Sequence, residues 1–90
     1  MRKIVGYDLI NGSSEDYNNI IDYLENRLKA KRMTESCWAF NSNLDNESLF
    51  NTIKSQVKCD IRLFVYDFDG NGYIGNLYCD ASELKALRYL

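Results

Sequence analysis

An aspartate inside an apolar stretch is the first residue of this sequence that could do chemistry. Asp8 follows Val5, Gly6 and Tyr7 and precedes Leu9. A carboxylate among apolar residues is costly to bury unless it is paired, hydrogen-bonded or bound to a metal. Because Mg²⁺ keeps several waters and needs few protein carboxylates, two Asp8 side chains that meet across a dimer would suffice as ligands. The alternative is that Asp8 ends a strand and caps the following turn, and the residue types leave both interpretations open.

Residues 67–78 are similar to the beginning of a calcium-binding EF-hand loop. Asp67, Asp69 and Asn71 stand at loop positions one, three and five, and a glycine follows at position six. Position twelve is Tyr78 instead of the glutamate that closes such a loop, and the residues before Asp67 are typical of a strand rather than of an entering helix. The sequence Asp-Gly-Asn-Gly at 69–72 is also typical of a hairpin turn. We therefore expect a hairpin and rank calcium binding below it.

Three aromatic residues, Phe64, Tyr66 and Phe68, are spaced by two along one expected strand. Alternate residues of a strand share a face, so these rings would form an aromatic surface to which Tyr7 of the first strand could add. One interpretation is a platform on which RNA bases stack, with Arg62 beside it. The interpretation that we favour is that the rings fill the core or a dimer interface, where aromatic residues are enriched.

The composition limits the chemistry further. The chain has no histidine, which excludes Ser-His and Cys-His nucleophilic sites and the commonest zinc sites. Its three cysteines, Cys37, Cys59 and Cys79, are far apart and form no CxxC pair, so we expect free thiols and a cytoplasmic protein. Catalysis would have to rest on carboxylates, hydroxyls, tyrosines or a hard metal ion.

Length and charge indicate one small domain over residues 1–90. A chain of 90 residues buries a modest core, so it would gain stability by forming a homodimer. The net charge of −2 gives no general attraction for nucleic acid. A local basic cluster does exist, which we interpret as the solvated end of a helix; it comprises Arg27, Lys29, Lys31 and Arg32.

No membrane association is expected. The sequence has no apolar run near the roughly 20 residues that span a bilayer. Its first residues also lack the apolar core and cleavage site of a signal peptide, which again favours a cytoplasmic location.

The elements that must position these residues follow from the hydrophobic pattern. Strands are expected at residues 3–10, 36–41, 60–67 and 73–78. Helices are expected at residues 13–29, 45–57 and 80–90. Ser13 with Asp16 resembles a capping box for the first helix, and Asp45 is the expected cap of the second.

These elements predict an α+β fold of the ferredoxin-like class. We expect the order β-α-β-β-α-β and a C-terminal tail or short helix, arranged as a two-layer sandwich. Two helices would cover one face of an antiparallel sheet. The other face would be left for a protein partner, a second copy of the chain, or bases.

Three of the expected strands carry short motifs that, taken together, resemble the Cas2-like group of small ferredoxin-fold proteins, in particular those labelled SinR family. Residues 4–9, Ile-Val-Gly-Tyr-Asp-Leu, match a hydrophobic-x-Tyr-Asp-Leu first strand. Residues 36–40, Ser-Cys-Trp-Ala-Phe, match a Ser-x-Trp-apolar-apolar second strand. Residues 60–65, followed by Gly70 and Gly75, resemble the third strand and its hairpin, so the similarity spans residues 3–77.

The resemblance implies a homodimer in which the aspartate that closes the first strand binds a metal. In this chain that residue is Asp8, and Ser36 is the nearest match to a serine beside it on the second strand. The implied activity is that of a Mg²⁺-dependent endonuclease acting on RNA or DNA. Two features do not fit that activity. The net charge is negative, and the strands lack a dense set of Arg and Lys residues to hold the phosphates of a nucleic acid.

A non-catalytic protein-interaction module on the same fold is the main alternative. An accessory, toxin-antitoxin or phage-encoded protein would have this size and this acidic, Asn-rich character. A calcium-binding loop at residues 67–78 is the third hypothesis.

Overall fold

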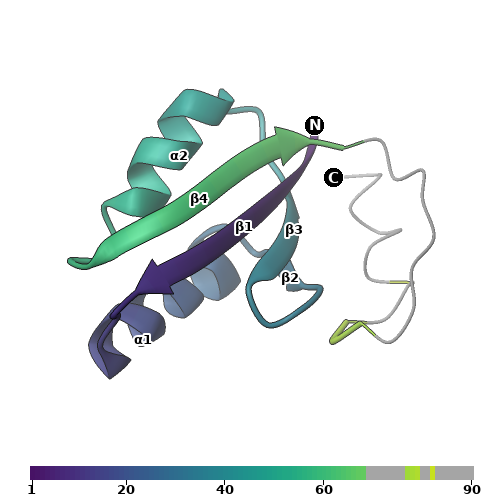
Figure 1. Cartoon of the computed structure of the whole chain (residues 1–90). Coiled ribbons are helices and arrows are strands. Elements are labelled where there is room, and N and C mark those ends of the chain that lie inside the picture. The colour runs from purple at the N-terminus through teal and green to yellow at the C-terminus, as the bar shows by residue number, and fades with distance from the viewer. Residues whose placement is uncertain (69–76, 80–81, 83–90) are drawn as a thin grey trace.

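The computed structural model describes residues 1–68, 77–79 and 82 (Figure 1). Within these residues the strands and helices follow in the order β1 (Arg2–Ile10), α1 (Ser14–Asp22), β2 (Lys31–Arg32), β3 (Cys37–Asn41), α2 (Asn46–Lys54) and β4 (Asp60–Asp67). A π-helical turn, η1 (Tyr23–Arg27), prolongs α1. The α+β class and the order β-α-β-β-α-β are confirmed, although the expected ranges taken along the chain run β-α-β-α-β-β-α and the observed order arises from the short strand β2. No helix in the described part of the chain is long and apolar enough to span a membrane.

The four strands form one antiparallel sheet in the order β2-β3-β1-β4. Strand β1 is central, and it pairs with β4 from Lys3 to Ile10. Its pairing with β3 ends at Gly6, which lies opposite Cys37. The last residues of β1 therefore have β4 on one side and, among the described residues, no strand on the other. Both helices lie behind the sheet in Figure 1, which makes a two-layer sandwich compatible with the ferredoxin-like class.

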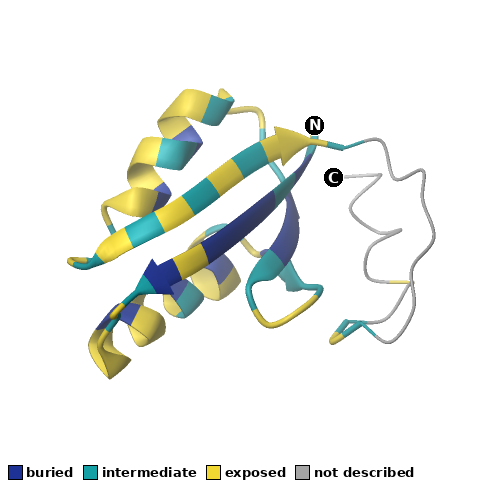
Figure 2. Ribbon diagram, in the orientation of Figure 1, coloured by how far each residue is buried: buried dark blue, intermediate teal, exposed yellow. Residues whose placement is uncertain are grey.

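The core lies between the sheet and the helices. Alternate residues of β1 face the helices, and most of this strand is buried (Figure 2). Strand β4 instead alternates between half-buried and exposed residues. The core cluster includes Val5, Tyr7, Leu9, Ile20, Leu24, Trp38, Phe40, Leu49 and Ile53. From β4, Ile61, Leu63 and Val65 pack against this cluster.

Both helices begin at the residues that the sequence predicts. Ser13 Oγ accepts a hydrogen bond from the Asp16 amide at 3.1 Å, and the Asp16 carboxylate accepts from the Ser13 amide at 3.1 Å. Asp16 also accepts from the backbone N–H of Lys58 at 2.9 Å, which ties the start of α1 to the segment before β4. The bonds from Lys58 and Ser13 lower the pKa of Asp16. Asp45 caps α2 by accepting from the amide of Ser48 at 2.8 Å.

Two expectations about the strands are wrong. The strand at 36–41 is the third and not the second, and the strand at 60–67 is the fourth and not the third, because β2 precedes both. Lys31 and Arg32 of β2 were expected at the solvated end of a helix, yet they pair with Ala39 and Trp38. A strand of two residues has no alternating pattern, so the sequence could not reveal it.

The expected C-terminal elements lie outside the described residues. This applies to the hairpin turn at 69–72, to the helix at 80–90 apart from Ser82, and to most of the strand at 73–78. Leu77 and Tyr78 are described, and neither is in a strand.

Candidate functional site

The face of the sheet turned away from the helices, here called the open face, carries the candidate site. We define it by Ile4, Gly6 and Asp8 of β1 together with Arg62, Phe64 and Tyr66 of β4. Residues that pair directly across an antiparallel sheet lie on the same face. Three cross-strand pairs follow, and they are Ile4 with Tyr66, Gly6 with Phe64, and Asp8 with Arg62.

Two aromatic rings stand side by side on the open face. The ring centroids of Phe64 and Tyr66 are 5.7 Å apart and their planes are inclined by 45°. Phe64 is 43 % exposed and Tyr66 is 64 % exposed. The expectation that these rings fill the core is therefore wrong, although a dimer interface stays open as a use for them. Phe68, just beyond β4, has the guanidinium carbon of Arg2 5.4 Å from its ring centroid.

Tyr7 does not belong to this aromatic surface. It pairs with Leu63, so its ring lies on the helix-facing side of the sheet, where it is buried in the core. Burial raises the pKa of its hydroxyl. The prediction that Tyr7 joins Phe64 and Tyr66 is thus wrong, because the two strands are paired in the register that places it on the opposite face.

Gly6 makes room for the ring of Phe64. A Cβ atom at residue 6 would lie 2.3 Å from both Cε1 and Cζ of Phe64. Carbon atoms are in favourable contact only at about 3.5–4.0 Å, so no side chain fits between the strand and the ring. Phe64 can lie over β1 because residue 6 is a glycine.

Asp8 lies inside β1 and on the open face. Its Oδ2 accepts a hydrogen bond from Arg62 Nη1 at 3.1 Å, and the two side chains are 69 % and 73 % exposed. The interpretation that Asp8 ends the strand and caps the following turn is wrong, since β1 continues to Ile10 and the Asp8 carboxylate accepts from Arg62 across the sheet. An exposed ion pair contributes only about 0–1 kcal/mol, so Asp8 can exchange Arg62 for another cation at little cost.

Ser36 lies close to Asp8, in the bend before β3 and not on a strand. Its carbonyl oxygen accepts a hydrogen bond from the amide of Tyr7 at 3.1 Å. Asp8 and Ser36 both line two neighbouring hollows. One, of about 390 Å³, is also lined on the open face by Gly6, Cys37, Arg62 and Phe64. The other, of about 230 Å³, is lined by Tyr7, Tyr17, Arg32 and Glu35 as well. The fold brings together the two residues that the sequence singles out.

A metal ion bound to Asp8 would also need ligands from outside this single chain. Over residues 1–68, 77–79 and 82, no three Asp, Glu or Cys side chains come together as a group that could hold a metal ion. At Asp8 the remaining ligands would be waters or a second Asp8 carboxylate from another copy.

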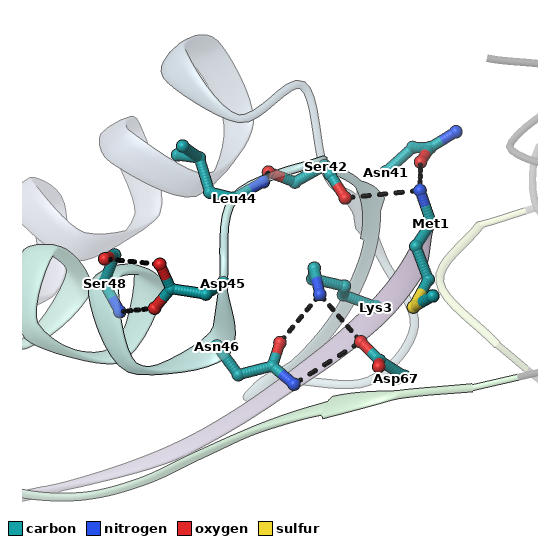
Figure 3. A network of polar contacts seen from close by, with 9 residues as sticks. All are labelled: Met1, Lys3, Asn41, Ser42, Leu44, Asp45, Asn46, Ser48 and Asp67. Carbon is teal, nitrogen blue, oxygen red and sulfur yellow. Dashed lines mark hydrogen bonds and ion pairs between the residues drawn. The ribbon is translucent and has the colours of Figure 1, made fainter.

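Asp67 is at the other end of β4 and takes part in a structural network (Figure 3). Its Oδ1 accepts from Lys3 Nζ at 2.7 Å, and Lys3 also donates to Asn46 Oδ1 at 2.8 Å. Lys3 is only 4 % exposed, so Asp67 neutralises a buried charge. The hydrogen bond from Lys3 lowers the pKa of Asp67. For the calcium-loop hypothesis, strand β4 lies where an EF-hand would have its entering helix. The other two expected ligands, Asp69 and Asn71, lie outside the described residues.

Comparison with known proteins does not add a function. No protein-family model and no curated protein matches this chain. The likeness to the Cas2-like group therefore rests on the three strand motifs, and the site has to be interpreted from its own geometry.

A second cluster of charged and aromatic residues was not predicted. The guanidinium carbon of Arg32 lies 5.3 Å from the ring centroid of Trp38 and 5.5 Å from that of Tyr78. Arg32 also donates through Nε and Nη2 to the carbonyl of Glu35, at 3.0 and 2.6 Å. The amide of Tyr78 donates to the carbonyl of Met33 at 3.0 Å. Tyr78 is far from the other residues of this cluster in the sequence, and the basic cluster around Arg32 was the only available signal.

Proposed function

We propose that this protein is a nucleic-acid-associated protein of the Cas2-like kind and that it binds single-stranded nucleic acid on its open face. The observation that supports this is the pair of exposed rings, Phe64 and Tyr66, on a sheet face that neither helix covers. Bases stack on such rings with about 1–3 kcal/mol per base. We expect the protein to act in the cytoplasm, as its three separated cysteines favour.

Cations lie at both ends of the row of rings. Arg62 precedes Phe64 on the same face of β4, and Arg2 lies over Phe68 beyond Tyr66. A nucleic-acid backbone that runs along β4 would meet a guanidinium at each end of the stack, and Arg side chains suit phosphate oxygens. Because the protein carries a net charge of −2, affinity would depend on stacking and on these two residues.

Binding of fluorescently labelled single-stranded RNA and DNA, measured by anisotropy at two salt concentrations, tests the proposal. The wild type should bind with an affinity that falls as salt rises. Phe64→Ala and Tyr66→Ala should each weaken binding about tenfold or more. Leu44→Ala is the control, since Leu44 is an exposed apolar side chain, 59 % exposed, in the loop before α2. No salt-sensitive binding by the wild type, or equal losses in all three variants, would refute a role for the rings.

The shared position of Asp8 and Ser36 favours a second candidate activity, a metal-dependent endonuclease formed by a homodimer. If the dimer brings two Asp8 carboxylates together, they would hold Mg²⁺ and activate a water that attacks the phosphodiester bond. The Ser36 hydroxyl is available to donate a hydrogen bond to a phosphate oxygen. Arg62 would then leave Asp8 for a phosphate, a small rearrangement because the ion pair is exposed.

A cleavage experiment separates the enzyme from a binding protein. Labelled single-stranded RNA and double-stranded DNA are incubated with Mg²⁺, Mn²⁺ or EDTA, and light scattering establishes whether the protein is a dimer. Cleavage that needs metal and is lost in Asp8→Asn but kept in Asp60→Asn would establish Asp8 as a metal ligand. Binding without cleavage would leave a non-catalytic nucleic-acid protein. Neither binding nor cleavage would favour the protein-interaction module, and the open face would then be tested for protein partners.

A further inference from the structure

The larger of the two hollows at Asp8, about 390 Å³, brings an aromatic ring and an ion pair together on the open face. Gly6 and Phe64 form one cross-strand pair of its lining, and Asp8 and Arg62 form the next pair along the same strands. Every lining residue falls between residues 6 and 64, within the continuously described part of the chain. A ligand in this hollow therefore meets a stacking surface, a carboxylate and a guanidinium at once.

The carboxylate of Asp8 is unexpected on a face that binds nucleic acid. A negative charge repels the phosphates that supply most of the electrostatic attraction for such a protein. The ion pair of Asp8 with Arg62 is mostly exposed, so it adds little to the stability of the fold. Bases, unlike phosphates, carry N–H donors that a carboxylate accepts, and bases in single strands are recognised through hydrogen bonds to their edges.

Asp8 lies at the right separation from Phe64 to meet the edge of a stacked base. The ring of Phe64 lies over Gly6, and Asp8 is two residues farther along β1 on the same face. Strands rise by about 3.4 Å per residue, which places Asp8 about 7 Å from Gly6 along the strand. Half the width of a base and one hydrogen bond of about 2.9 Å together cover this span. A base that stacks on Phe64 can therefore turn its edge toward Asp8.

We propose that this hollow selects guanine among the bases that stack on Phe64. An ionised carboxylate has two oxygens with about four acceptor positions, so the bond from Arg62 leaves Asp8 able to accept two further donors. Guanine carries two neighbouring donors on its Watson–Crick edge, N1–H and the exocyclic N2 amine, and the adjacent O6 is an acceptor for Arg62. The selection deepens the proposed function and rests on it, since the base reaches the hollow as part of a bound strand.

The other bases fit the pair of Asp8 and Arg62 less well. Adenine and cytosine each offer one exocyclic amine beside a ring nitrogen that is itself an acceptor and would face the carboxylate. Uracil and thymine place a single N–H between two carbonyl oxygens, which the carboxylate repels. Guanine is thus the base that gives Asp8 two donors side by side.

Anisotropy with four labelled oligonucleotides tests the selection. Each is a short uridine strand with one central guanosine, inosine, adenosine or cytidine, and EDTA is present so that no metal ion occupies Asp8. The guanosine strand should bind at least about tenfold more tightly than the adenosine and cytidine strands. Inosine differs from guanosine by the missing exocyclic amine, so its strand should bind at least about threefold more weakly than the guanosine strand.

Asp8→Asn should reduce the preference for guanosine over adenosine to less than about threefold, because an amide offers a single acceptor oxygen. The ratio of affinities is the readout, since loss of a negative charge raises the affinity for every strand. Glu47→Gln removes the same charge from α2, behind the sheet, and should keep the full preference (Figure 1).

The outcomes separate this proposal from the proposed function. Equal affinities for the four strands, a preference for another base, or an undiminished preference in Asp8→Asn would overturn the selection of guanine and leave binding on the open face in place. No binding of any strand by the wild type would overturn both.

Discussion

Replacement of Gly6 by alanine tests how Phe64 is held on the open face. The new Cβ would lie 2.3 Å from two carbon atoms of the Phe64 ring. Since favourable carbon contacts begin at about 3.5 Å, the ring has to move by roughly 1 Å or more. Gly6 lies within the regular strand β1, so the backbone itself accepts alanine and the clash with the ring is the main consequence.

The magnitude follows from two opposing effects. Full burial of a Phe side chain stabilises a protein by about 1.5–3 kcal/mol. Phe64 is 43 % exposed, so a fully displaced ring would lose about 1–1.5 kcal/mol. Alanine in a strand is favoured over glycine by about 0.5–1 kcal/mol, because the unfolded chain loses less backbone freedom on folding. In the wild type Gly6→Ala should therefore change the free energy of unfolding by between zero and a loss of about 1 kcal/mol.

In a Phe64→Ala background the ring is absent and the sign should reverse. Gly6→Ala should then stabilise the protein by about 0.5–1 kcal/mol, which gives a coupling between the two positions of about 1 kcal/mol. Urea unfolding of the four proteins, followed by the fluorescence of Trp38, measures this coupling. The displaced ring should also weaken nucleic-acid binding in Gly6→Ala to nearly the level of Phe64→Ala.

An equal effect of Gly6→Ala in both backgrounds would refute this reasoning. It would mean that the Phe64 ring does not lie over residue 6, and the arrangement of the open face would then lose its main support. A change in the urea dependence of unfolding, rather than in its midpoint, would instead indicate an altered unfolded state.

Four further predictions concern carboxylates. Because hydrogen bonds lower the pKa of Asp16 below its ordinary value of 3.8, its ionised form stabilises the fold above about pH 4, and this contribution is lost as the pH falls further. The urea midpoint of Asp16→Asn should accordingly fall less between pH 6 and pH 3 than that of the wild type. Asp8→Asn should change the free energy of unfolding by less than about 1 kcal/mol, since its ion pair with Arg62 is mostly exposed, and a larger loss would show a structural role. Asp67→Asn should lower the thermal midpoint markedly because it leaves the buried Lys3 without its charged partner. Calorimetry should show no micromolar Ca²⁺ site in the wild type, and Ca²⁺ binding that depends on Asp67 would contradict this assignment.

Local patterns were enough to predict most elements of the fold. The alternation in residues 3–10 and the β-branched and aromatic run at 60–67 gave two strands with nearly the observed bounds. The capping residues Ser13 and Asp45 located the starts of both helices. These signals are local because a strand or a cap depends on residues within a few positions of each other in the chain.

The sequence also singled out Asp8 and Ser36, but their surroundings depend on the pairing of strands. Asp8 meets Arg62, and Phe64 covers Gly6, only because β1 and β4 pair in one particular register. A shift by one residue would place Tyr7 beside Phe64 and turn Asp8 toward the helices. A single strand carries no information on its register with a partner far along the chain, so Tyr7 was assigned to the wrong face.

The amino-acid sequence by itself thus determined the fold class, the helix caps, two strands and the residues whose side chains could do chemistry. Only the tertiary structure decided which of those residues meet. It paired Asp67 with the buried Lys3, exposed the rings of Phe64 and Tyr66, and set Asp8 and Arg62 beside the hollow at Phe64. The physical reason is that elements form from short-range preferences, whereas sites form where distant segments pack, and that packing is set by burial and register across the whole chain.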